Sequence, residues 1–270
     1  MNQTSRPRLG LLSRPGREPY RREAKGLTLI ELLVVIAIVG TLAALMLPAT
    51  SRFKIKTQVQ TARLEIDQIA TAVAEYESIY GRFPVSREAS RAAAVGDDDV
   101  TYGAVIKETH TWLAGPVSYL TNNCEPMAVL LDLEYYRDGA STINQDHVRN
   151  PRKVRFLNAP TSDNTNAAHG VGIDGVYRDP WGSPYLVTLD LNGDGRARDV
   201  LYREPDVSAN PKDPNLGLRG LVRGVDAQGK PFFEATAPVM VWSAGPDRHV
   251  DTKEKADRGV NRDNILSWSR

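Results

Sequence analysis

The chain has 270 residues, of which 41% are hydrophobic and 25% are charged. This composition is typical of a folded protein and excludes disorder of the whole chain. The formal net charge of +1 gives no electrostatic case for a dedicated nucleic-acid binder. Only one segment is strongly apolar and the mean hydropathy is -0.37, which excludes a multi-pass membrane protein. The single cysteine, Cys124, excludes an intramolecular disulfide, so a core, oligomer contacts or a metal ion must stabilise the fold.

The apolar segment covers residues 27–47 and contains one charged residue, Glu31. As a helix, about 20 residues at about 1.5 Å each cross a hydrocarbon core. Seven basic residues precede this segment against two acidic ones, which predicts a single-pass anchor with a cytoplasmic N-terminus. A secretory signal peptide fits less well, because its apolar region would be short and would end at a small-residue cleavage site. A plain anchor leaves Glu31 without a role, since a carboxylate in the membrane is costly and usually functional.

Residues 25–36, KGLTLIELLVVI, resemble the prepilin processing motif of type IV pilins and of type II secretion pseudopilins. The resemblance implies cleavage after Gly26 by a membrane prepilin peptidase and N-methylation of the new terminal residue, Leu27. It also implies that Glu31 guides assembly by pairing with the N-terminus of a neighbouring subunit. Leu27 stands where phenylalanine is commonest in the family. The leader, residues 1–26, is long for the family, which favours a translation start downstream of Met1.

The segment after the membrane run, residues 48–84, has the pattern of an amphipathic helix. Pro48 lacks an N–H group and favours a kink at the start of this segment. Apolar residues then recur at spacings of three and four, which indicates one buried helix face that seats a globular head: Ile55, Val59, Ala62, Ile66, Ile69, Val73, Tyr76 and Tyr80. Gly81 and Pro84 are predicted to end the helix.

The remaining residues, 85–270, are predicted to form one head outside the cytoplasm. Three segments resemble major pseudopilins: YGRFP at residues 80–84, DPWGSPYLV at 179–187, and the C-terminal part at 239–268. Strands are predicted at residues 185–189 and 239–242. The head is interrupted by two stretches without family counterpart, about 86–176 and 191–238, which we interpret as insertions.

Calcium is the one cofactor for which the residues offer chemistry, because it binds six to eight oxygen ligands. By resemblance, Asp247 and Asp263 are the best candidate ligands, with Asp251 and Asn264 as further ones. The alternative is a solvated loop whose acidic charges are balanced by its own basic residues. Few residues between 245 and 264 are apolar, so burial alone is not expected to order this loop. A second candidate, Asp190, Asn192 and Asp194, matches the start of an EF-hand loop, but position twelve is Leu201 and an ordinary turn is favoured.

No pattern indicates an enzyme. The four histidines are scattered without ligand spacing, and neither H-E-x-x-H nor G-x-S-x-G occurs. Residues 170–175 match G-x-G-x-x-G, but no strand precedes them and no amphipathic helix follows, so a dinucleotide site is rejected.

The sequence therefore predicts an α+β protein with a long N-terminal helix packed on a small antiparallel sheet. By resemblance it is a structural subunit of a type II secretion pseudopilus, anchored in the bacterial inner membrane with a periplasmic head. Its implied partners are copies of itself, the prepilin peptidase, membrane lipid and, indirectly, an assembly platform and ATPase. Two alternatives remain: a type IV pilin or minor pilin acting in adhesion or DNA uptake, and an anchored calcium-binding head that does not polymerise.

Overall fold

The computed structural model of the chain describes residues 26, 28–96, 99–103, 121–163 and 168–269. Most of the predicted leader and Leu27 lie outside the described residues, as do the side chains at 44–52 and 95–96. The chain divides into two compact units, residues 1–50 and residues 51–270.

Helix α1 (Leu29–Tyr80) is 52 residues long and continues through Pro48, so the proline does not end it. In the first unit its large apolar side chains are exposed at successive positions, for example Leu32, Leu33, Val34, Val35 and Ile36, and so on every side of the helix. Among the residues that the structure describes, no helix combines the length and the apolarity needed to cross a membrane. The membrane span expected at residues 27–47 therefore stays a prediction.

In the second unit, one face of α1 is the centre of the core, as the apolar spacing predicts. Ala62, Ile66, Ile69, Val73 and Tyr76 are at most 1% exposed. The predicted stripe begins too early, because Ile55 is 47% exposed and only the residues from Val59 onward pack on the head. Helix α1 ends at Tyr80, as expected, since Gly81 adopts a φ of 62°, which favours glycine.

A four-stranded antiparallel sheet forms the centre of the head. Its strand order is β1 (Val100–Tyr102), β4 (Leu186–Leu189), β7 (Val239–Ser243) and β8 (Ile265–Leu266). In the centre of the sheet, Val187 pairs with Val241. The strands predicted at residues 185–189 and 239–242 are thus confirmed within one residue at their ends, and the prediction of an α+β fold with an N-terminal helix and an antiparallel sheet is confirmed.

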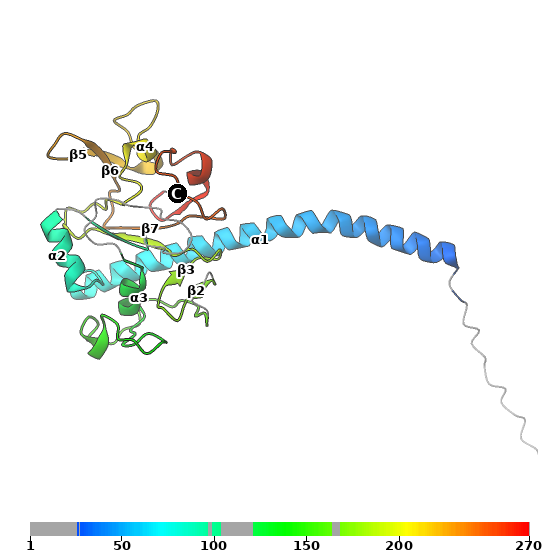
Figure 1. Cartoon of the computed structure of the whole chain (residues 1–270), viewed down its shortest axis with the longest axis horizontal. Coiled ribbons are helices and arrows are strands. Elements are labelled where there is room, and N and C mark those ends of the chain that lie inside the picture. The colour runs from blue at the N-terminus through cyan, green and yellow to red at the C-terminus, as the bar shows by residue number, and fades with distance from the viewer. Residues whose placement is uncertain (1–25, 27, 97–98, 104–120, 164–167, 270) are drawn as a thin grey trace, which may run out of the picture. The chain divides into compact units, whose positions relative to one another are not determined.

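The two faces of the sheet carry different cores, because side chains alternate along each strand. Val187 and Val241 belong to the cluster that includes the buried face of α1. Leu186 and Trp242, on the opposite face, belong to a second cluster built mostly by residues 197–256. In Figure 1, β7 lies between α1 on one side and the elements α4 (Pro205–Ser208), β5 (Val222–Val225) and β6 (Pro231–Glu234) on the other. The second predicted insertion therefore covers a sheet face that would otherwise be exposed.

The first predicted insertion packs around the C-terminal half of α1. It contains α2 (Arg87–Gly96), α3 (Cys124–Leu130), a 3-10 turn at Gln145–His147, and β2 (Gly170–Val171), which forms a hairpin with β3 (Tyr177–Arg178) just beyond the predicted boundary. The G-x-G-x-x-G match at residues 170–175 is β2 and the turn of this hairpin, so no helix follows it.

Candidate functional site

The predicted cleavage site lies at the start of α1. Gly26 is exposed, and a Cβ atom added to it would meet nothing within 4 Å. The fold of the chain therefore does not require glycine at this position. A requirement for glycine there would have to come from an external partner such as a peptidase. Leu27, the residue predicted to carry the methyl group, lies outside the described residues.

Glu31 takes part in a local interaction that the sequence reasoning missed. Its carboxylate atom Oε2 accepts hydrogen bonds from the backbone N–H of Thr28 (2.8 Å) and from the Thr28 hydroxyl (2.7 Å). The N–H of Glu31 donates to the Thr28 hydroxyl oxygen at 3.3 Å. This reciprocal pair is a capping box, and its signal, T-x-x-E before an apolar helix, is readable in residues 28–31. Glu31 therefore caps its own helix as well as being the predicted assembly residue.

The DPWG turn and the C-terminal segment, both predicted by resemblance, meet at one buried carboxylate. Asp179 is 0% exposed and accepts bonds from the N–H groups of Trp181 and Ser183, each at 2.9 Å. Its second oxygen accepts the Ser243 hydroxyl at 2.6 Å, directly at the end of β7. The Gln58 side chain of α1 also donates to the carbonyl of Pro180 at 3.1 Å, so this turn is joined to the helix too.

The C-terminal loop is ordered by polar side chains that bind its backbone. Asn261 is 0% exposed; its amide donates to the carbonyls of Asp251 (2.7 Å) and Glu254 (2.8 Å), and its oxygen accepts the Asp251 N–H (3.0 Å). The Arg219 guanidinium donates to the carbonyls of Ala256 and Arg262. These bonds order the loop without a metal ion, although few of its residues are apolar.

Asp247 and Asp263, the two main candidate calcium ligands, are brought together. The pKa of Asp263 is raised first by burial and then by the nearby Asp247 carboxylate. Their segments are in contact, since a Cβ at Gly245 would collide with the Asp263 carbonyl. The Oδ1 atoms of Asp263 and Asn264 are buried without a hydrogen-bond partner among the described residues. Asp251 is exposed, and its carboxylate accepts the N–H of Lys253 at 2.7 Å instead.

Over the described residues, no group of three His, Cys, Asp or Glu side chains has a geometry that could hold a metal ion. A calcium ion at Asp247 and Asp263 would therefore need amide and carbonyl oxygens for most of its coordination sphere. The buried, unpartnered oxygens of Asp263 and Asn264 fit that donor set.

The second candidate loop behaves as a turn. Asp190 is 4% exposed, and its carboxylate accepts the backbone N–H groups of Gly193 (2.7 Å), Asp194 (3.2 Å) and Gly195 (2.7 Å). Asn192 donates its amide to the Asp194 carboxylate at 3.4 Å. The oxygens that an EF-hand would offer to calcium are thus engaged with the loop itself, which agrees with the turn interpretation.

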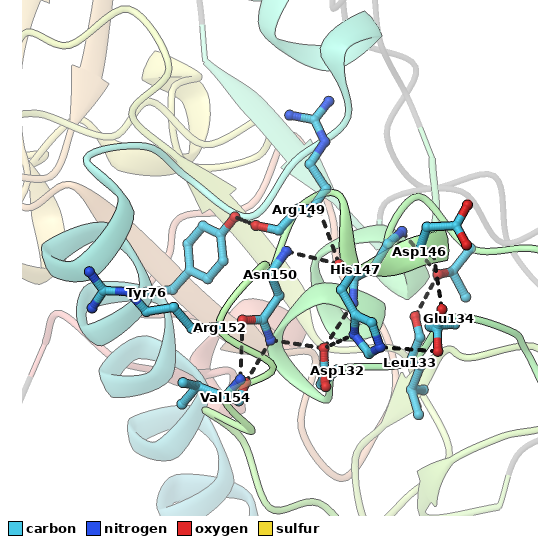
Figure 2. A network of polar contacts seen from close by, with 12 residues as sticks. Tyr76, Asp132, Leu133, Glu134, Asp146, His147, Arg149, Asn150, Arg152 and Val154 are labelled. Carbon is cyan, nitrogen blue, oxygen red and sulfur yellow. Dashed lines mark hydrogen bonds and ion pairs between the residues drawn. The ribbon is translucent and has the colours of Figure 1, made fainter.

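The first insertion contains a polar network that no sequence motif predicts (Figure 2). His147 is held between two carboxylates, with Nδ1 2.9 Å from Asp132 and Nε2 3.1 Å from Glu134. Asp132 also accepts the side-chain amides of Asn144 and Asn150, each at 3.1 Å. These bonds fix the chain between residues 144 and 154, which reaches the C-terminal end of α1.

The Asp179 junction predicts a pH dependence of folding. Burial raises the pKa of Asp179 to about 6. An acid whose pKa is raised in the native state stabilises the fold only while it is protonated. The contribution of Asp179 to the free energy of unfolding is therefore present below pH ~4 and is lost as the pH rises through ~6. Relative to Asp179→Asn, the wild-type chain should lose about 3 kcal/mol of unfolding free energy between pH 4 and 7.

Urea unfolding in detergent, followed by tryptophan fluorescence at several pH values, measures this difference. Asp138→Asn, which changes an exposed carboxylate, is the control and should track the wild type. Parallel pH profiles for wild type and Asp179→Asn would show that Asp179 does not titrate in this range.

Comparisons with known proteins match a part of the chain. The family model described as the prokaryotic N-terminal methylation motif matches residues 21–47. The type IV major pilin protein PilE1 of Neisseria gonorrhoeae is 40% identical over 84 residues, which are 31% of this chain and 50% of that protein. A fimbrial protein of Neisseria meningitidis serogroup A is 42% identical over 73 residues, which are 27% of this chain and 43% of that protein. A fimbrial protein of Pseudomonas aeruginosa is 44% identical over 62 residues, which are 23% of this chain and 40% of that protein.

The chain thus matches about half the length of these curated relatives. No solved structure matches it significantly. The relatives are named as pilins and fimbrial proteins, which agrees with the expectation of a structural protein rather than an enzyme. Residues 21–47 thus match the prepilin-type methylation motif, and the chain is similar to type IV pilins over about a third of its length.

Proposed function

We propose that the chain is a subunit of a type IV pilin-like filament, made as a prepilin and cleaved after Gly26. The observation that carries this proposal is the methylation motif at residues 21–47, which includes the first part of α1, where apolar residues are exposed on every side of the helix. A helix that is apolar all round needs a cover of lipid or of other helices. In this proposal, lipid of the inner membrane covers the helix before assembly, and helices of neighbouring subunits cover it afterwards.

In this proposal the basic leader keeps the N-terminus in the cytoplasm, residues 27–47 span the inner membrane, and the head is periplasmic. The peptidase acts on Gly26, which the fold itself leaves unconstrained. A membrane assembly platform and its ATPase then add the subunit to the filament. Glu31 attracts the new terminal ammonium group of a neighbour, because opposite charges interact strongly where water is excluded.

Two versions of the proposal differ in the filament that is built. The curated relatives support a type IV pilin or minor pilin. The pseudopilin of a type II secretion system is supported by the head, where the DPWG turn and the C-terminal segment meet at Asp179. We favour the pseudopilin, because both head segments that resemble pseudopilins take part in one buried contact. Accumulation of secreted proteins in the periplasm of a deletion strain would support this version, whereas normal secretion with lost surface fibres would support the pilin.

The assembly role of Glu31 is separable from its capping role. Glu31→Gln keeps a side-chain oxygen that can accept the Thr28 bonds, but it removes the negative charge. If pairing with a neighbour's ammonium drives assembly, this variant should insert normally and yield roughly tenfold less filament, the factor that ~1.4 kcal/mol of lost attraction gives. Filament yield after shearing or co-purification is the measurement.

Thr28→Val is the matched control, because it weakens the cap without changing the charge. It should assemble close to the wild-type level. Equal defects in Thr28→Val and Glu31→Gln would instead assign the effect to the helix cap, and normal assembly of Glu31→Gln would remove the pairing from the proposal.

We further propose that the pair Asp247 and Asp263 binds calcium in the C-terminal loop. The support is the buried Oδ1 of Asp263, which lacks a hydrogen-bond partner in the described structure, and the nearby Asp247 carboxylate. Two carboxylates that repel each other are relieved by a divalent cation between them. The alternative, a solvated loop held by Asn261 and Arg219, leaves the buried Oδ1 of Asp263 without a hydrogen-bond partner among the described residues.

Calcium should therefore raise the melting temperature of the detergent-solubilised chain. A ligand that binds only the native state adds about 2.7 kcal/mol at a hundredfold excess over Kd. Asp263→Asn should have two opposite effects: a higher melting temperature in chelator at neutral pH, because the raised pKa of Asp263 marks its charge as destabilising, and loss of the calcium response.

Asp194→Asn is the control, because its side chain belongs to a turn, and it should keep the calcium response. Identical melting of the wild-type chain in calcium and in chelator would refute the calcium proposal without affecting the filament proposal.

A further inference from the structure

Two basic segments meet at the C-terminal end of α1. Residues 82–91 contain three arginines and one acid, Glu88. Residues 149–155 contain three arginines, one lysine and no acid. A chain with a formal net charge of +1 thus places seven basic residues and one acidic residue in these two short segments.

Hydrogen bonds hold the two segments together. The carbonyl of Arg149 accepts the Tyr76 hydroxyl at 2.6 Å and the Arg82 guanidinium at 3.2 Å. The Tyr80 hydroxyl donates to the Asn150 side chain at 2.7 Å and accepts the N–H of Arg152 at 3.1 Å. Both tyrosines belong to α1, so the end of this helix is the common support.

Hydrogen bonds also hold the backbone of residues 149–154 in place. Asn150 donates to Asp132 (3.1 Å) and to the carbonyl of Val154 (2.7 Å), and Asp132 is in turn bound by His147. Figure 2 shows the guanidinium groups of Arg149 and Arg152 directed away from this network. The network therefore fixes the backbone and makes no hydrogen bond to these two guanidinium groups, of which that of Arg152 lies over the Tyr80 ring at 6.0 Å from its centroid.

Four residues form what we name the arginine patch: Arg82, Arg87, Arg149 and Arg152. Three of them are exposed and Arg149 is half-buried. Within the described part of the chain, no carboxylate forms an ion pair with any of the four. The pKa of Arg149 is lowered by burial and by the nearby Arg82 and Arg87, while attraction from Glu88 is the weakest influence on it. The patch is thus a cluster of like charges without an ion-pair partner among the described residues.

We propose that the arginine patch is a docking surface for a carboxylate-rich face of another protein. The planar guanidinium group binds carboxylates through two parallel hydrogen bonds, which suits a patch made of arginine. Glu88, next to Arg87, argues against a continuous polyanion, because its charge would repel the chain of phosphates that crosses the patch. A folded partner with separate carboxylates can place them on the arginines and leave Glu88 clear.

The test uses the full chain in detergent and a fluorescent oligoglutamate peptide as the probe. Arg87→Glu/Arg152→Glu reverses two exposed charges whose guanidinium groups make no hydrogen bond in the described structure. Lys212→Glu/Arg223→Glu reverses two exposed charges elsewhere in the head and changes the net charge equally. Fluorescence anisotropy should show binding weakened roughly tenfold or more by the patch variant and less than about twofold by the control.

Three outcomes overturn the proposal. The first is absence of peptide binding by the wild-type chain. The second is equal weakening by both variants, which would reflect net charge alone. The third is tighter binding of a single-stranded oligonucleotide of equal charge, lost in the patch variant, which would make the patch a polyanion site. Unchanged melting temperatures of both variants establish that the comparison concerns binding and not folding.

Discussion

The burial of one face of α1, from Ala62 to Tyr76, is the contact on which the rest of the head depends. The C-terminal half of α1 contributes one face to the core, and the sheet presents an apolar face to it. The opposite face of the same sheet then needs a cover of its own, which residues 197–256 provide around Trp242. The second insertion is thus a structural consequence of how the sheet is used.

The lack of a disulfide in the described head is offset by buried aspartates that bind the backbone. Asp179 and Asp190 each accept at least two backbone N–H groups, and so does Asp199, which also accepts the Thr188 hydroxyl and the Trp242 indole. Loop N–H groups buried without partners would be costly, and these aspartates satisfy them. Hydrogen bonds to a carboxylate are also stronger than neutral ones, but for Asp179 burial outweighs them and raises its pKa. These carboxylates fix the turns at residues 179–183, 190–195 and 199–202. The same burial makes Asp179 sensitive to pH.

Patterns with a short period could be read from the sequence, whereas contacts between distant residues could not. The spacing of Ile66, Ile69 and Val73 predicts the buried helix face, and apolar runs predict β4 and β7. The spacing could not show where the head begins, so Ile55 was wrongly included. Asn261 and Arg219 order the C-terminal loop through bonds to backbone atoms up to 43 residues away, and such bonds leave no local pattern. The capping box of Thr28 and Glu31 is readable in the sequence as T-x-x-E, whereas the resemblance assigns Glu31 a role in assembly alone.

The central claim is that the chain is a prepilin whose leader is removed at Gly26, since membrane release and assembly both follow from that cut. Mass spectrometry of the N-terminal peptide from membrane or filament fractions, with the peptidase present, tests it most directly. The account predicts a peptide that begins at Leu27 and carries one added methyl group, and a loss of cleavage in Gly26→Val, a change that leaves the fold intact because Gly26 has open space around it. A wild-type protein that retains residues 1–26 in both fractions would contradict the account.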